Sequence, residues 1–220
     1  MEIRLESDTS LADRVYLALE DAILSGQIGL GGRLLENEIA EKLSVSRAPL
    51  REALRRLHFE GLAETIPRRG TYVIKPSRQD IVALLQVREE LECLGARLAA
   101  EFISDRELGH LSNGLDRIGR LLAQNRKEGY PHHDIDFHKT VIQASGNGKV
   151  LQVMTGMYSQ IRLVRLMSGA RADRAPVAYR EHMAVFEALR SRNPAAAEEK
   201  MRKHLKSSAE NILNTFSAEE

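Results

Sequence analysis

Helical periodicity is the pattern that most constrains this chain, because it continues with hardly a break from residue 78 to residue 216. Leu, Ala, Arg and Glu are abundant in the chain, and these side chains favour helices. No strand pattern interrupts this region. Ser104 followed by Glu107 is typical of a helix start. We expect six helices here, over about Arg78–Phe102, Asp105–Arg126, Asp134–Ser145, Lys149–Met167, Arg174–Arg190 and Pro194–Phe216.

A domain boundary is expected at Pro76. Proline disfavours helix in the residue before it, and Ser77 with Asp80 then indicates a new helix start. The sequence therefore predicts two domains, residues 1–76 and residues 77–220.

Three helices are expected in the first domain. Apolar residues recur at helical spacing over residues 11–23 and 36–43. A third helix begins near Ser46, which we expect to cap it, and ends at Gly61. The spacing i, i+3, i+4, i+7 predicts a buried stripe on this helix, made of Leu50, Ala53, Leu54 and Leu57.

A hairpin is expected after the third helix. Residues 62–66 and 71–74 are short strand candidates, and the turn between them carries Arg68 and Arg69. Two exposed cations at a hairpin tip suit a wing that enters the minor groove of DNA.

Positive charge is concentrated in one segment. The chain has a net charge of only +1, yet residues 42–75 hold eight basic residues against three acidic ones. Arg47, Arg51 and Arg55 lie at i, i+4 and i+8, on the face of the third helix opposite the apolar stripe. Such a face is either merely solvated or binds guanine edges and phosphates. The preceding short helix, the tight turn and the basic hairpin favour DNA.

The segment LENEIAEKLSVSRAPLREALRRLHFEGLAETIPRRGTYV resembles the winged helix-turn-helix domain of GntR-type bacterial transcription regulators. The resemblance extends from about residue 9 to residue 75, and VSRAPLREAL is its most specific part. The DNA contacts that it implies are Ser46, Arg47, Ala48 and Arg51, with Gly70 at the wing tip. The arginine face and the basic turn add Arg55 and Arg69.

One pattern among the seven histidines is typical of a metal site. Asp134 and His138 are four residues apart, so on a helix they project from one face. His182 and His204 lie on the last two expected helices, and a bundle can bring these faces together. One carboxylate and three imidazoles suit Zn²⁺, Ni²⁺ or Mn²⁺.

Spacing alone leaves His132 with Asp136 as a competing pair. However, LLQVREELE, DIDFHKTVIQASGN and REHMAVFEALRSRNPAAAEEKMRKHL resemble the all-helical FCD effector domain of the FadR-like branch of GntR regulators. The resemblance covers about residues 78–216. It implies a divalent metal, with Zn²⁺ expected and Ni²⁺ or Mn²⁺ as alternatives. The ligand positions that it implies are Asp134, His138, His182 and His204.

Two further residues are candidates for binding an effector. Arg88 lies beside a core face, so it either pairs with Glu92, four residues on, or meets an anionic ligand. The resemblance implies the second role, contact with an effector carboxylate, which a guanidinium suits. It also implies that Asn147 lies near the pocket, although Asn147 is equally placed to cap the next helix.

These features together predict a mainly α protein: an N-terminal winged helix-turn-helix domain and a C-terminal bundle of about six helices. We expect a transcription regulator, a repressor, that binds double-stranded DNA under control of a small organic acid. The resemblance implies a homodimer, which matches a palindromic operator. A metal-dependent hydrolase using the Asp/His site is the alternative, and the metal itself as the signal stays open.

The location of the protein is expected to be cytoplasmic. The first ten residues, MEIRLESDTS, carry charged side chains from the second residue on and contain no apolar run, so no secretory signal is expected. No stretch approaches the ~20 apolar residues that span a bilayer. Cys93 is the single cysteine and cannot form an intrachain disulfide, which fits a reducing compartment.

Overall fold

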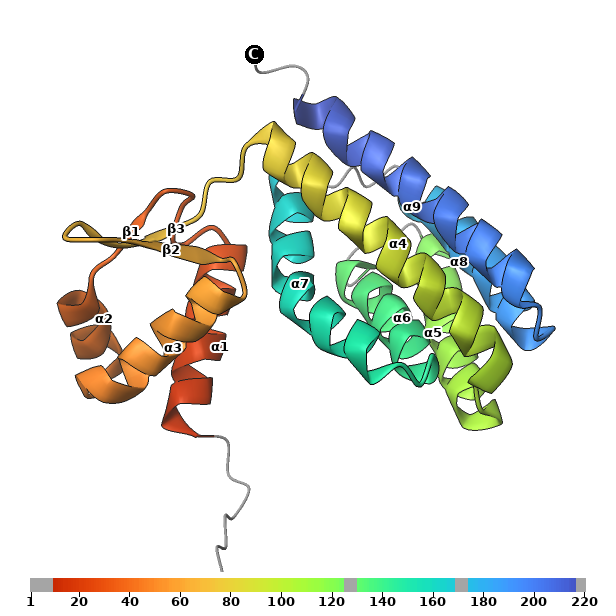
Figure 1. Ribbon diagram of the computed structural model, residues 1–220, viewed down its shortest axis with the longest axis horizontal. Coiled ribbons are helices and arrows are strands. Elements are labelled where there is room, and N and C mark those ends of the chain that lie inside the picture. The colour runs from red at the N-terminus through yellow and green to blue at the C-terminus, as the bar shows by residue number, and fades with distance from the viewer. Residues whose placement is uncertain (1–9, 125–129, 169–173, 217–220) are drawn as a thin grey trace, which may run out of the picture. The chain divides into compact units, whose positions relative to one another are not determined.

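The computed structural model describes residues 10–124, 130–168 and 174–216 (Figure 1). The chain forms two compact units that divide after Pro76. The described elements of the first unit are, in order, α1 (Leu11–Leu24), β1 (Arg33–Leu34), α2 (Glu36–Leu43), α3 (Arg47–Phe59), β2 (Ala63–Ile66) and β3 (Gly70–Val73).

Helix α3 packs against α1 and α2 through one apolar face. The four residues of the predicted stripe are at most 5% exposed, which confirms the stripe: Leu50, Ala53, Leu54 and Leu57. Ser44 adopts a left-handed conformation (φ 52°) after α2, so the chain turns sharply into α3. Ser46 occupies the N-cap position of α3, but its side chain makes no capping hydrogen bond. The expectation of a side-chain cap at Ser46 is therefore wrong.

The three strands form one antiparallel sheet in the order β1-β3-β2. The β2–β3 hairpin closes with Ile66 opposite Gly70, and Arg68 (φ 64°) and Gly70 (φ 112°) give the turn its tight path. The hairpin agrees with the sequence-based expectation. Strand β1 was not expected, because two residues carry no periodicity.

The described part of the second unit contains helices and no strand, in agreement with the predicted fold class. Its elements are α4 (Arg78–Phe102), α5 (Asp105–Ala123), α6 (Tyr130–Ala144), α7 (Gly148–Met167), α8 (Ala175–Arg190) and α9 (Pro194–Phe216). Helix α6 begins at Tyr130 rather than at the expected Asp134. The expected end of α5, Arg126, lies outside the described residues.

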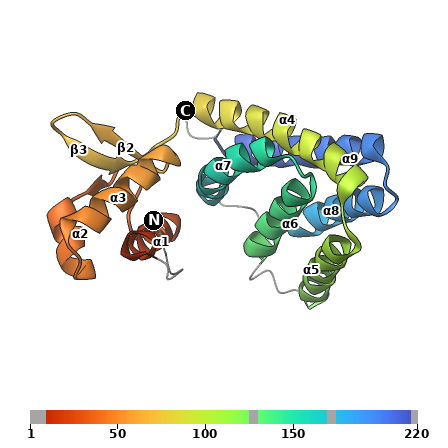
Figure 2. The ribbon, with the colours of Figure 1, turned by 60° about the horizontal axis from the view of Figure 1, so that its bottom comes forward.

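Helix α4 is the central packing element of this bundle. It lies along α9 in both ribbon views, and α8 packs on α9 (Figures 1 and 2). Four small α4 side chains that are fully buried allow this close packing: Cys93, Ala96, Ala99 and Ala100. A capping box at Ser77 and Asp80 fixes the start of α4, and another at Ser104 and Glu107 starts α5, both as predicted.

None of the helices within the described ranges is long and apolar enough to cross a lipid bilayer.

Candidate metal centre and nucleic-acid interface

Three histidines from three helices meet in the interior of the second unit. His138 of α6, His182 of α8 and His204 of α9 are each at most 2% exposed. Their candidate ligand nitrogens all lie within 4.8 Å of one another. His204 Nε2 is 3.2 Å from His182 Nε2 and 3.2 Å from His138 Nε2. The packing of α6, α8 and α9 therefore directs three imidazole nitrogens toward one point.

Asp134 lies one helical turn before His138 on α6 and is also buried. Its Oδ1 is 3.7 Å from His182 Nε2, and its Oδ2 is 3.9 Å from His138 Nε2. The Nη1 of Arg165, on α7, donates to Oδ2 of Asp134. All four predicted ligand positions thus lie in one buried cluster. No pattern in the sequence indicated Arg165 beside them.

Two of the imidazoles are oriented by carboxylates. His138 donates from Nδ1 to Oε2 of Glu92, and His204 donates from Nδ1 to Oε2 of Glu181 at 2.8 Å. A carboxylate accepts hydrogen bonds, so each Nδ1 carries a proton, and in the neutral imidazole Nε2 then presents a lone pair. This is the arrangement that fixes metal-binding histidines in proteins.

Each of these carboxylates is paired with an arginine. Arg88 Nε lies 2.7 Å from Glu92 Oε1, and Arg174 Nη2 lies 3.0 Å from Glu181 Oε2. Arg174 and Glu181 are further partners that the sequence analysis missed.

His182 is held differently. Its ring stacks on the ring of Phe137 with the centroids 4.3 Å apart. Its Nδ1 is buried and has no hydrogen-bond partner among the described residues. Packing, rather than a carboxylate, therefore orients this imidazole.

The chemistry of the donors fits a divalent metal. The Nε2 atoms of His138 and His204 both present lone pairs, and they face each other at 3.2 Å. Two such nitrogens repel unless a cation lies between them. Ligand nitrogens about 2.0–2.1 Å from a tetrahedral Zn²⁺ stand roughly 3.3 Å apart, close to this spacing.

Burial favours the neutral form of two of the imidazoles, those of His182 and His204. It lowers the pKa of His182 well below the usual value, and His204 adds to the shift. Burial also lowers the pKa of His204 to about 4, although Glu181 opposes it. Burial alone would raise the pKa of Asp134, but Arg165 and the imidazoles outweigh it and hold that pKa well below its usual range. Neutral imidazoles and an ionised carboxylate are the forms that bind metal.

Of the competing pair, His132 with Asp136, the structure describes only the side chain of Asp136. Asp136 is exposed, and it lines a separate pocket of about 280 Å³ between α5 and α6 with Leu115 and Phe137. The side chain of His132 lies outside the described residues.

The two candidate effector residues lie in different surroundings. Arg88 is 3% exposed and bound to Glu92, the pairing that the sequence left open. Asn147 caps α7, where its Oδ1 accepts from the backbone amides of Lys149 and Val150. The surface pocket that Asn147 lines contains none of the four predicted metal ligands.

The predicted DNA-contacting side chains lie on the surface of the first unit. Six of them are exposed, and Gly70 is half-buried at the end of the hairpin turn; the exposed six are Ser46, Arg47, Ala48, Arg51, Arg55 and Arg69. They lie at the N-cap of α3 (Ser46), along α3 from Arg47 to Arg55, and at the hairpin tip.

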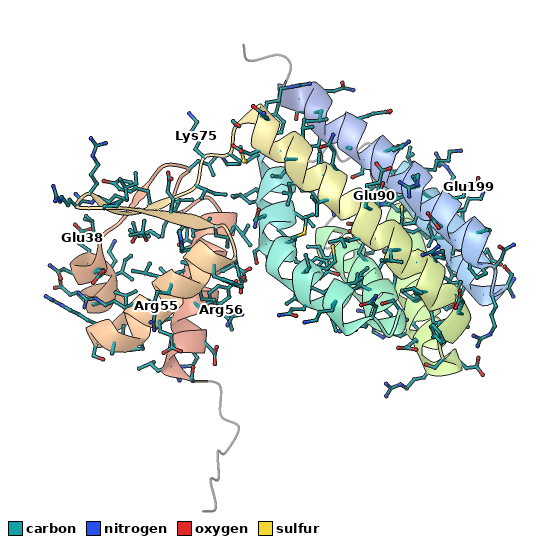
Figure 3. The ribbon with its side chains drawn as sticks, in the orientation of Figure 1. Glu38, Arg55, Arg56, Lys75, Glu90 and Glu199 are labelled. Atoms are coloured by element: carbon teal, nitrogen blue, oxygen red, sulfur yellow. The ribbon has the colours of Figure 1, made fainter. Side chains whose placement is uncertain are left out.

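Arg51 and Arg56 show that the basic residues of α3 are not equivalent. Arg51 makes an ion pair with Glu36 at 2.9 Å, and its side chain is 61% exposed, so solvent weakens this pair. Arg56, labelled in Figure 3, instead contacts α1. Its Nη1 lies 3.1 Å from Oδ1 of Asp13, and its guanidinium lies over the ring of Tyr16. Arg56 therefore stabilises the domain, whereas its neighbour Arg55 remains exposed.

Two families match the chain, one for each unit. Residues 11–73 match the family described as "Bacterial regulatory proteins, gntR family". Residues 83–207 match the family described as "FCD domain".

Curated relatives match along nearly the whole chain. The HTH-type transcriptional repressor RspR of Escherichia coli (strain K12) is 27% identical, over 96% of this chain and 93% of the relative. An HTH-type transcriptional regulator of Streptomyces ambofaciens, found in an unstable DNA locus, is 30% identical, over 90% of this chain and 83% of the relative.

A solved structure matches as well. The crystal structure of a GntR transcriptional regulator from Rhodococcus sp. RHA1 has a TM-score of 0.75 and 26% identity, and the match covers 92% of this chain and 97% of that chain.

Proposed function

Because the chain belongs to the GntR family of bacterial regulatory proteins, with an FCD domain, and is a DNA-binding transcription regulator, we propose that it is a repressor controlled by a small organic acid. The acid would bind beside a divalent metal in the second unit. The observation that carries this proposal is the convergence of three histidine Nε2 atoms next to a buried carboxylate.

The metal would be held by Asp134, His138, His182 and His204. Three imidazoles and one carboxylate suit Zn²⁺ first, with Ni²⁺ and Mn²⁺ as alternatives. A bound metal supplies a Lewis acid that attracts a carboxylate oxygen. Coordination positions that the protein leaves open are where the acid would bind.

Arg88 is the proposed partner for the effector carboxylate. A guanidinium has five N–H donors, and the bond to Glu92 uses one of them. Asn147 remains proposed as a second effector contact, although its Oδ1 already caps α7. The effector need supply only ~1–3 kcal/mol of coupling to change operator affinity 5–150-fold.

DNA would be bound by the exposed face of α3 and by the hairpin tip. Backbone amides at the N-terminus of α3 suit a phosphate, and the arginines suit guanine edges. We propose that a homodimer presents two such units to a palindromic operator. The expected location is the cytoplasm.

The experiment that tests this function is selection of tight-binding duplexes from a randomised DNA pool at a fixed salt concentration, read by sequencing. Salt is fixed because phosphate contacts make affinity strongly salt-dependent. Enrichment of a short palindrome supports a dimeric, sequence-specific regulator, and the enriched duplex then serves to screen organic acids for release. Failure of the folded, metal-loaded protein to enrich any sequence would contradict the proposal.

Arg47→Ala is expected to weaken binding to the selected duplex by about 1–3 kcal/mol, if Arg47 reads a guanine edge. The side chain is exposed at the first position of α3, so its loss leaves the fold intact. Fluorescence anisotropy with the selected duplex measures the change. Arg190→Ala, at an exposed arginine of α8 in the other unit, is the matched control and should bind DNA like the wild type. Equal affinity of Arg47→Ala and the wild type would remove Arg47 from the interface.

The hydrolase alternative has less support from the site. Hydrolysis by a metal-bound water needs a nearby group that accepts a proton. Glu92 and Glu181 contact the imidazoles, but each is already held by one histidine and one arginine. Neither is placed as a general base.

A further inference from the structure

We propose that Arg165 competes with the metal ion for Asp134 and thereby sets the metal affinity of the site. This inference rests on the proposed metal centre. It assigns a role to a residue on α7 that neither the sequence pattern nor the family resemblance singles out.

The positions of the candidate ligand atoms are the first reason. Two pairs of imidazole nitrogens already have the spacing of a coordination sphere, because Nε2 of His204 lies 3.2 Å from Nε2 of both His138 and His182. The carboxylate oxygens of Asp134 stand further out, at 3.7 and 3.9 Å from the nearest of these nitrogens. Ligand atoms of one Zn²⁺ are separated by only roughly 3.3 Å. Asp134 must therefore move inward by several tenths of an ångström to join the imidazoles.

Arg165 holds Asp134 in this outer position. Its Nη1 donates to Oδ2, one of the two oxygens that a metal could use. Asp134 is 4% exposed at its side chain and Arg165 is 18% exposed, so water screens this pair poorly. A metal that takes Asp134 must either displace the guanidinium or share the carboxylate with a second positive charge.

The other two arginines of the cluster, Arg88 and Arg174, hold the carboxylates that bind Nδ1 of the imidazoles, the ring nitrogen that does not face the metal position. Arg88 acts through Glu92 on Nδ1 of His138, and Arg174 acts through Glu181 on Nδ1 of His204. A carboxylate at Nδ1 orients the ring and raises the basicity of Nε2, which favours metal binding. Arg174 therefore supports the site through its carboxylate, whereas Arg165 occupies an atom that the metal needs.

Replacing Arg165 and replacing Arg174 by glutamine are therefore expected to change the Zn²⁺ affinity in opposite directions. Zn²⁺ affinity is measured on the full-length protein by competition with a chromophoric chelator, for the wild type, Arg165→Gln and Arg174→Gln. Arg165→Gln is expected to bind Zn²⁺ about tenfold or more tightly, while Arg174→Gln is expected to bind Zn²⁺ more weakly, because Glu181 loses the guanidinium that helps to hold it against Nδ1 of His204. Unchanged or weaker Zn²⁺ binding by Arg165→Gln overturns the proposal, because Arg165 would then be a supporting partner of Asp134.

Thermal unfolding gives a second readout that does not depend on the chelator. Without metal, Arg165→Gln removes the guanidinium that donates to the Asp134 carboxylate. The midpoint temperature of thermal unfolding is therefore expected to fall. Added Zn²⁺ should then raise the midpoint of Arg165→Gln by more than it raises that of the wild type. An equal or smaller rise contradicts the proposal.

Arg165→Lys keeps the test decisive if the glutamine variant does not fold without metal. Lysine retains the charge but loses the planar fork of donors, so its Zn²⁺ affinity should lie between those of the wild type and Arg165→Gln. An affinity below the wild type overturns the proposal. If the wild type itself binds no stoichiometric Zn²⁺, Ni²⁺ or Mn²⁺, the metal centre and this inference are both overturned.

Discussion

Replacing His182 and His204 together by alanine is expected to leave the protein without stoichiometric metal. Only His138 and Asp134 would remain of the four proposed ligands, fewer than the three protein ligands that even open zinc sites use. The wild type should carry one divalent ion per chain after purification in metal-supplemented medium. Metal content by mass spectrometry, normalised to protein, measures the difference.

His110→Ala is the matched control for this experiment. His110 is an exposed histidine of α5 outside the cluster, so its removal should leave the metal content unchanged. Because two buried imidazoles are lost in the double variant, circular dichroism must first establish that its helices are retained. A folded double variant with the metal content of the wild type would contradict the assignment of these ligands.

The helices of this chain were predictable where one face is buried along several turns. Helix α4 begins and ends at the residues that the periodicity predicts, since a 25-residue helix shows its period many times. The stripe from Leu50 to Leu57 is buried for the same reason. Strand β1 contains two residues, and its pairing with β3 depends on a partner almost 40 residues away. No local pattern encodes such a pairing.

The candidate metal ligands were predictable partly from their spacing in the sequence and partly from the family resemblance. Asp134 and His138 share a helix face through their spacing, but the family resemblance was needed to add His182 and His204. The arginine–carboxylate pairs differ in whether local spacing could predict them. Glu92 follows Arg88 by four residues, so that pair could be anticipated, whereas Arg165 and Asp134 are 31 residues apart in the sequence. That contact depends on how α6 and α7 pack, which spacing along the chain does not specify.

Glu92→Gln is expected to destabilise the metal-free second unit by about 3–5 kcal/mol, the usual result of removing one partner from a buried ion pair. Glu92 is fully buried and Arg88 is 3% exposed, so the substitution leaves a guanidinium charge in the interior. Arg88 and His138 hold the pKa of Glu92 at about 2 against the opposing effect of burial, so the carboxylate is ionised at neutral pH. Urea unfolding of the full-length protein, followed by circular dichroism, measures the loss.

Glu90→Gln is the matched control, because Glu90 lies on the same helix (Figure 3) and also pairs with an arginine, Arg202. Its side chain is 71% exposed, and exposed pairs contribute only ~0–1 kcal/mol. Equal losses from Glu92→Gln and Glu90→Gln would mean that Arg88 does not depend on Glu92.

A double variant separates the unpaired charge from other consequences of losing Glu92. Arg88→Met with Glu92→Gln removes both charges, so it should recover most of the stability that Glu92→Gln alone loses. The recovered protein still lacks the carboxylate that orients His138, and its metal affinity should remain 10–100-fold weaker. Recovery of stability without recovery of metal binding would therefore assign two separable roles to Glu92: neutralising Arg88 in the core and fixing the imidazole of His138.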